Sequence, residues 1–144
     1  MSFQARVALS LFLLRLTVAL VFLMWTLQKF LHPDKAINIY ETFFYVPNLV
    51  PQIIYIIAVL ETILLIAFIT GYKKHIVYWI VVACHGLSTG AALMNYFEPF
   101  RSPVNLLFFT AWPMLAACFT LAILNRWDTW LTIRSVTKAF STRD

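Results

Sequence analysis

Long apolar stretches with almost no charged residues constrain this chain more than any other feature of its sequence. Four stretches contain at most one Asp, Glu, Lys or Arg: residues 7–28, 50–72, 76–97 and 102–125. Arg15 interrupts the first of these and Glu61 the second. Each stretch is close to the ~20 residues that a helix needs to cross ~30 Å of hydrocarbon. The pattern therefore predicts helices that span a membrane.

Composition supports the same class. Hydrophobic residues make up 62% of the 144 positions and charged residues only 12%, more apolar surface than a soluble domain of this size can bury in one core. We expect an all-α, integral-membrane four-helix bundle that forms a single domain over residues 1–144. Its predicted spans are residues 7–31, 50–72, 75–97 and 104–125. The first helix is too long, and carries Arg15 too early, to be a cleavable signal peptide.

The distribution of basic residues predicts the orientation. If the helices span in turn, one side of the membrane holds seven basic residues: Arg6, Lys73, Lys74, Arg126, Arg134, Lys138 and Arg143. The other side holds three: Lys29, Lys35 and Arg101. Since cytoplasmic segments are enriched in Lys and Arg, we expect both termini in the cytoplasm of a bacterium, with the protein in its inner membrane. Topology and contact with anionic lipids explain the net charge of +5 without a nucleic-acid partner.

Two segments outside the predicted spans carry aromatic residues. Residues 32–51, on the outer side, hold Tyr40 and Tyr45 between prolines, which fits a short interfacial helix, a re-entrant cap or a simple apolar connector. In residues 127–144, tryptophans and apolar residues alternate with Arg134 and Lys138. That alternation predicts an amphipathic helix on the inner leaflet.

Three ionisable residues fall within predicted spans: Arg15, Glu61 and His85. If the first span starts near Val7, helical rise places all three about 12–15 Å from the cytoplasmic face. Charged groups at such depth pair with one another or face a cavity. One interpretation is an Arg15–Glu61 ion pair that only holds helices together. The other is a polar pocket, in which Arg15 binds an anionic or carbonyl group while Glu61 and His85 exchange protons.

The sequence around His85 contains further polar and small residues. Ser88 and Thr89 lie about one turn away and would lengthen a polar stripe. Gly86 and Gly90 form a small-xxx-small pair, which lets a second helix approach closely. Cys84 and Cys118 lie in different spans without a C-x-x-C motif, so we expect small apolar side chains, with a soft-metal or redox role as the lesser alternative. No established metal-site motif is present.

The chain resembles DoxX-type membrane proteins. The run LFLLRLTVALVFLMWTLQKFLHP is similar to the first helix of that family, which opens with Arg-Leu and closes with Lys-Phe or Lys-Leu before a proline. The matching residues are Arg15, Leu16, Lys29, Phe30 and Pro33, then Glu61 and Gly71 in the second helix, and Arg126, Trp127 and Asp128 after the last. The family's Gly-x-Gly before that last motif is absent, and CHGLST in the third span has no counterpart.

This resemblance implies a four-helix bundle and an association with redox physiology, including quinone-linked thiosulfate oxidation, oxidative-stress complexes and small accessory proteins. We therefore expect an accessory protein of a redox or quinone-linked complex, with a membrane-protein partner or a second copy of itself. Its polar layer would hold a quinone or a lipid headgroup. The alternatives are a quinone-dependent oxidoreductase subunit, whose electrons a partner would supply, and a small-molecule binding or transport protein.

Overall fold

The structure is a computed structural model that describes residues 1–100 and 106–133, and every regular element in those ranges is helical. The elements are α1 (Phe3–Leu31), α2 (Pro33–Phe44), α3 (Pro51–Ile69), α4 (Lys74–Ala91), α5 (Leu93–Phe97), the 3₁₀ helix η1 (Leu106–Thr110) and α6 (Ala111–Ile123). The predicted all-α fold is confirmed for this part of the chain.

Local sequence explains where these helices begin and end. The hydroxyl of Ser2 accepts a hydrogen bond from the backbone N–H of Ala5 and so caps α1. Pro33 and Pro51 begin α2 and α3, because the first helical position needs no N–H donor. Pro113 cannot donate to residue 109 and its ring crowds that carbonyl. This explains why α6 begins only at Ala111, after a 3₁₀ segment.

The predicted spans match the helices with two differences. Spans 7–31 and 50–72 correspond to α1 and α3, although α1 starts four residues earlier, at Phe3. Span 75–97 is divided between α4 and α5, because the first of these helices ends at Ala91. Span 104–125 contains η1 and α6, and its first residues lie outside the described part.

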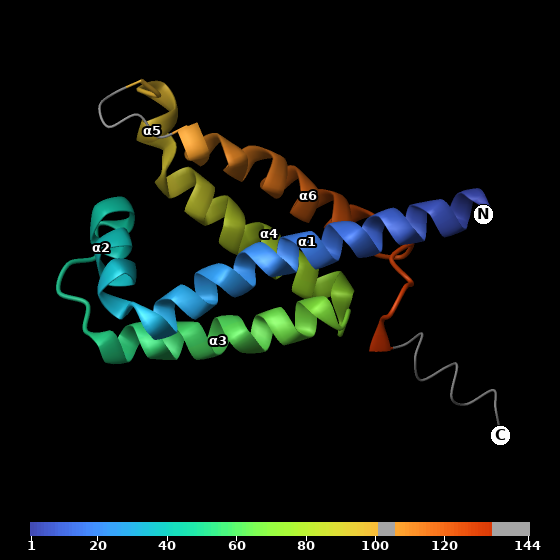
Figure 1. The fold of residues 1–144 in the computed structure, drawn as a ribbon, viewed down its shortest axis with the longest axis horizontal. Helices are drawn as coiled ribbons and strands as arrows, with labels where there is room; N and C mark the ends of the chain where they lie inside the picture. The colour runs from blue at the N-terminus through green and yellow to red at the C-terminus, as the bar shows by residue number, and fades with distance from the viewer. Residues whose placement is uncertain (101–105, 134–144) are drawn as a thin grey trace.

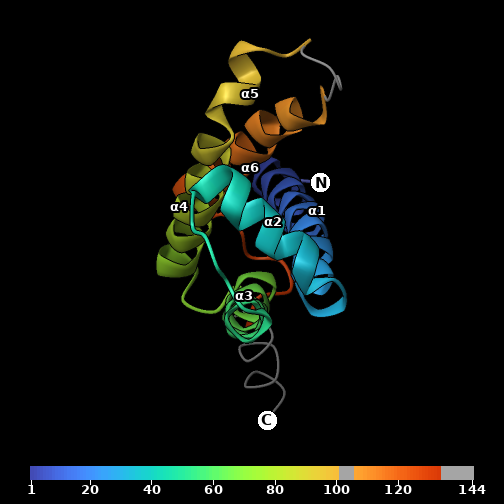
Figure 2. The same ribbon diagram turned by 90° about the vertical axis from the view of Figure 1, so that its left-hand side faces the viewer.

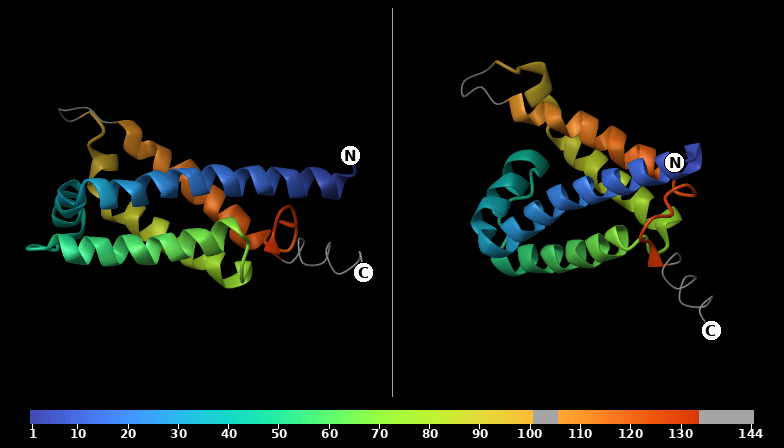
Figure 3. Two further views of the ribbon diagram at one scale, coloured as in Figure 1. Left: turned by 60° about the horizontal axis from the view of Figure 1, so that its bottom comes forward. Right: turned by 45° about the vertical axis from the view of Figure 1, so that its right-hand side comes forward.

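The helices form two antiparallel pairs. α1 packs along α3, and α4 packs along α6 (Figure 1). Further contacts of α1 with α6, and of α3 with α4, join the pairs. The pairs approach each other where α3 ends and α4 begins, and they diverge toward α2 and α5 (Figures 1 and 3). We call the first of these ends, where Arg15 and Gly71 lie, the apex, and the other the open end.

Helix α2 lies across the open end (Figure 2). It packs against α1 and α3, and the ring of Phe43 lies 5.7 Å from the ring of Phe108 in η1. Ala36 is its only buried residue. Of the alternatives for residues 32–51, the structure therefore shows a short helix that caps the bundle.

The surface is that of a membrane protein. Within residues 1–100 and 106–133, three helical segments are long and apolar enough to cross a bilayer: Phe3–Leu31, Pro51–Ile69 and Leu106–Ile123. Less than a third of each apolar window is buried inside the protein. Leu20, Ile56 and Ile63 are each about 60% exposed, which lipid contact accommodates and water does not.

The start of the predicted amphipathic helix of residues 127–144 is not helical. Residues 128–132 are non-helical, and Leu131 has a positive φ of 46°. The segment instead turns across the apex, where the side chain of Asp128 is fully buried. Residues 134–144 lie outside the described part.

Candidate functional site

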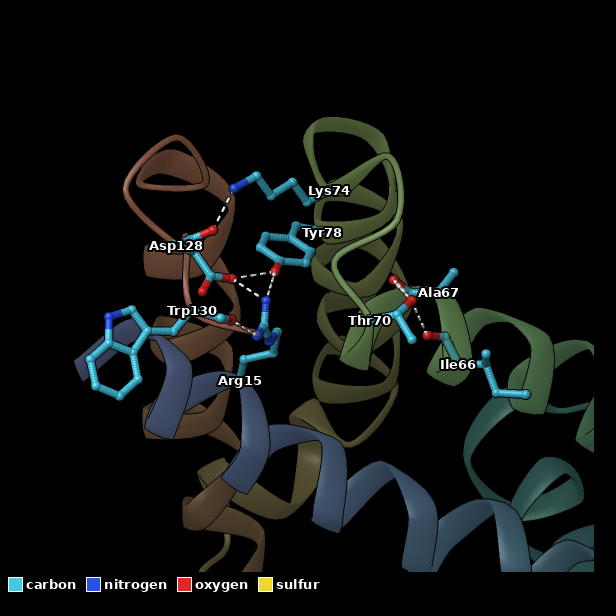
Figure 4. Close-up of polar contacts among 8 residues, drawn as sticks. All are labelled: Arg15, Ile66, Ala67, Thr70, Lys74, Tyr78, Asp128 and Trp130. Atoms are coloured by element: carbon cyan, nitrogen blue, oxygen red, sulfur yellow. Dashed lines mark hydrogen bonds and ion pairs between the residues drawn. The ribbon is translucent and has the colours of Figure 1, made fainter. Parts of the chain in front are cut away.

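A network of polar groups closes the apex around Arg15 (Figure 4). Arg15 Nη1 lies 2.8 Å from Asp128 Oδ2 and also donates to the Tyr78 hydroxyl at 3.3 Å. Its Nη2 donates to the carbonyl of Trp130. The Tyr78 hydroxyl donates to the same Asp128 oxygen, and Lys74 Nζ donates to the Asp128 carbonyl. The guanidinium thus joins α1, α4 and the C-terminal segment.

This apex network is sealed from its surroundings. The side chains of Arg15 and Asp128 are 1% and 0% exposed. The C-terminal segment is tied to α3 as well, since the Ile133 N–H donates to the Thr70 carbonyl at 3.0 Å. Removing one partner of a buried ion pair typically costs 3–5 kcal/mol. The network has the properties of an architectural clamp.

Gly71 allows the close approach at the apex. Its φ is +65°, a conformation that glycine adopts without strain. A Cβ at this position would lie 2.9 Å from Thr132 Cγ2 and 3.2 Å from Arg15 Nη1. The chain can therefore turn from α3 into α4 directly against the clamp only because residue 71 lacks a side chain.

The predicted Arg15–Glu61 ion pair is wrong. The N-terminal part of α1 extends past the end of α3 (Figure 3), so Arg15 lies beside Gly71. Glu61 lies ten residues before Gly71, about 15 Å away along α3. The sequence-based depth assumed that α1 enters the membrane near Val7, which placed Arg15 too deep.

Sequence reasoning missed the true partners of Arg15. Tyr78 was taken as part of an apolar span, and Asp128 as part of a surface helix. One signal was available: among the segments assigned to the cytoplasmic side, Asp128 and Asp144 are the only acidic residues. A buried Arg near that side needs a carboxylate, and Asp128 directly follows the last apolar span.

Glu61 belongs to a second polar site, halfway along α3. Its Oε2 lies 2.9 Å from Lys29 Nζ and accepts a hydrogen bond from the Thr26 hydroxyl at 3.2 Å. Both of these partners lie on α1. The Glu61 side chain is 34% exposed, so this ion pair, unlike the one at the apex, is open on one side.

A cavity of about 80 Å³ adjoins this site. It lies between α1, α3 and α4, and most of its walls are apolar. The lining residues are Phe22, Thr26, Glu61, Leu64, Leu65, Phe68, Val81 and Cys84. Apolar cavities with one or two polar groups are the usual form of small-molecule binding sites.

Tyr40 of α2 lies close to the same site. Burial, followed by the nearby negative charge of Glu61, raises the pKa of the Tyr40 phenol above its ordinary value. The phenol therefore stays protonated at neutral pH and is a hydrogen-bond donor.

His85 lies between α4, α1 and α6 and is not part of either polar site. Its Nε2 lies 3.2 Å from the Ala111 carbonyl, so this nitrogen carries the proton. Phe22 and Trp25 both lie 5.8 Å from its ring. The Nδ1 atom is buried and has no hydrogen-bond partner in the described residues. The expected layer of Arg15, Glu61 and His85 is therefore absent.

The predicted polar stripe is also divided. Thr89 is buried, but its hydroxyl donates to the His85 carbonyl within α4. Ser88 is exposed on another face of the same helix. Gly86 and Gly90 do not support close packing among the described residues. There, a Cβ at Gly86 would meet its nearest atom at 3.8 Å, and one at Gly90 would meet none within 4 Å.

The two cysteines lie in different environments. Cys118 is buried in the core, whereas Cys84 is exposed and lines the cavity. Both are free thiols. Across residues 1–100 and 106–133, no three His, Cys, Asp or Glu side chains are grouped as a metal site requires.

Comparisons with protein families, with curated proteins and with solved structures give no match to this chain. The DoxX-type resemblance therefore stays a prediction.

Proposed function

We propose that this protein is a four-helix integral-membrane protein of a bacterial inner membrane, with both termini in the cytoplasm. The three apolar segments supply three crossings, and α4 supplies the fourth. The hydropathy of α4 is reduced by Tyr78, His85 and Thr89, but these polar side chains are buried inside the bundle. Its exposed side chains include Ile76, Ile80 and Leu87, which suit lipid.

Within the membrane, the protein works as an accessory protein that binds a membrane amphiphile. The observation that carries this proposal is the cavity beside the Lys29–Glu61 pair, whose carboxylate is one-third exposed. A carboxylate in the middle of a spanning helix is costly to leave against hydrocarbon and usually marks a functional site. A bound polar head would complete the hydrogen bonding of the pair, and apolar walls would contact the adjoining chain.

The DoxX-type resemblance adds the proposal that the protein acts beside a redox or quinone-linked complex, through a membrane-protein partner or a second copy. The apex clamp would then hold the bundle, and the cavity would hold the ligand. Neither role requires the protein to carry a reaction of its own.

Ligand extraction tests this proposal. The protein is purified in phosphatidylcholine nanodiscs, and its lipid extract is analysed by mass spectrometry. Wild-type protein should retain an amphiphile that Glu61→Leu loses. Glu41→Leu is the matched control, because Glu41 is exposed on α2 and does not line the cavity. Equal retention by wild type and Glu61→Leu would contradict the proposal.

A further inference from the structure

We infer that the ligand of the Glu61 cavity is a neutral, long-chain amphiphile with a hydroxyl head, and not a quinone. This inference rests on the proposed binding function and specifies its ligand class. Three properties of the site carry it: the hydrogen bonds still available, the charge balance and the volume.

The available hydrogen bonds select a group that both donates and accepts. Lys29 and Thr26 both contact Oε2 of Glu61, and Oε1 receives no hydrogen bond from residues 1–100 or 106–133. An ionised carboxylate oxygen only accepts, whereas an ammonium group only donates and has three N–H bonds. A hydroxyl can donate to Glu61 Oε1 while its oxygen accepts from Lys29. A quinone carbonyl only accepts, so it leaves the Glu61 oxygen unpaired.

Charge balance selects a neutral head. The Lys29 and Glu61 charges cancel across 2.9 Å. A fatty-acid carboxylate would bring a net negative charge into the apolar bundle, and a quaternary ammonium would bring a positive one. An uncompensated charge in such surroundings is strongly unfavourable. A hydroxyl adds no charge.

Volume favours a linear chain over a ring. The cavity measures about 80 Å³, whereas an apolar protein cavity that holds benzene measures about 150 Å³. A benzoquinone ring is larger than benzene, so this cavity cannot enclose it. A hydroxyl and its first methylene groups do fit. The carboxylate is one-third exposed, so the polar end of the site can be reached from outside.

Photoaffinity labelling in phosphatidylcholine nanodiscs tests the inference, because phosphatidylcholine has no hydroxyl group to compete. The probe is decanol with a diazirine close to its hydroxyl, and labelled peptides are mapped by mass spectrometry. We expect labels on the α1, α3 and α4 walls of the cavity. Glu61→Leu should reduce them at least fivefold, and Glu41→Leu should leave them unchanged.

Competition then identifies the ligand class. Unlabelled decanol should reduce labelling at least fivefold at a concentration where decanoate, decyltrimethylammonium and decyl-benzoquinone reduce it less than twofold. Stronger competition by decyl-benzoquinone than by decanol would overturn the ligand class but leave the proposed binding function standing. Labelling of the cavity walls that neither Glu61→Leu nor any competitor reduces would overturn both.

A second variant guards against misfolding of Glu61→Leu. Leu65→Phe adds volume to the cavity wall and keeps the Lys29–Glu61 pair. It should reduce decanol labelling at least fivefold while the protein still elutes as a single species. Undiminished labelling in Leu65→Phe would contradict the assignment of the cavity as the binding site.

Discussion

Two ion pairs of the described residues, Arg15–Asp128 and Lys29–Glu61, both involve α1 but have different surroundings. Arg15–Asp128 is buried at the apex, where Tyr78 donates to Asp128 and Arg15 donates to the Trp130 carbonyl. Lys29–Glu61 is about 15 Å away along the bundle. Among the described residues Thr26 is its one further hydrogen-bond partner, and its carboxylate is one-third exposed. A charge whose partners are all internal is part of the architecture. A charge left partly uncovered beside a cavity is available to a ligand.

The buried pair at the apex also contains an oxygen without a hydrogen-bond partner in residues 1–100 and 106–133. Oδ1 of Asp128 is also buried without a hydrogen-bond partner in the described residues. The difference from Glu61 is access, because Asp128 is fully buried and nothing from the bilayer reaches it without displacing the C-terminal segment. Exposure, and not the count of hydrogen bonds, therefore separates the two pairs.

The largest expected effect concerns the side of the membrane on which the apex lies. A reporter fused after Asp144 should be active in the cytoplasm, and one inserted in the loop at residues 45–49 should report the periplasm. The measurement is an all-or-none activity of paired enzymatic reporters. A periplasmic C-terminal signal would place the Arg15 clamp at the outer end and reverse the arrangement proposed here.

Asp128→Asn should be the most destabilising single change to a polar group. It leaves the buried Arg15 guanidinium without a counter-charge, and we expect the free energy of unfolding to fall by about 3–5 kcal/mol. Thermal or denaturant unfolding in nanodiscs measures this. A loss below about 1 kcal/mol, which is typical of exposed ion pairs, would show that the apex is not sealed.

Gly71→Ala and Gly90→Ala form a matched pair. At Gly71 the positive φ and the contact with Thr132 predict a loss of about 1–3 kcal/mol in unfolding free energy. At Gly90, inside α4 with no atom within 4 Å, alanine should be neutral or stabilise by up to about 1 kcal/mol through helix propensity. Equal effects from the two changes, measured by unfolding, would contradict the close approach at the apex.

Glu61→Gln should destabilise the protein much less than Asp128→Asn. The amide keeps the volume and can still accept from Thr26, and the Lys29 side chain is itself partly exposed. We expect a loss of about 1 kcal/mol, because the hydrogen bonds remain while the charge is removed. A loss as large as that of Asp128→Asn would show that both pairs are architectural, and the comparison would fail.

Much of the fold could be predicted from sequence because hydrophobic runs and prolines act locally. The apolar stretches predicted α1, α3 and α6. Pro33 and Pro51 lie where α2 and α3 begin. The interruption of α4 at Ala92 had no comparable local signal. Residues 128–132 differ from the predicted amphipathic helix for a tertiary reason, since the bond of Asp128 to Arg15 overrides the amphipathic pattern around it.

The sequence predicted residues that belong to the polar sites, but not which residues pair with them. Arg15 and Glu61 were identified because ionisable groups are rare in spanning helices. Pairing depended on depth, and depth depended on where α1 enters the membrane. An error of a few turns in α1 moved Arg15 from the apex to the level of Glu61. The cavity depends on how the two helix pairs diverge. That divergence is set by side-chain packing, and the periodicity of the sequence does not predict it.

The central claim is that the Arg15 clamp holds the fold and the Glu61 site holds the ligand. Native mass spectrometry of Asp128→Asn and Glu61→Leu, purified side by side in phosphatidylcholine nanodiscs, tests it when combined with their melting temperatures. Asp128→Asn should keep its bound amphiphile at low temperature and melt several degrees earlier. Glu61→Leu should lose the amphiphile and melt much closer to the wild type. Loss of the amphiphile from Asp128→Asn with retention by Glu61→Leu would contradict this division of roles.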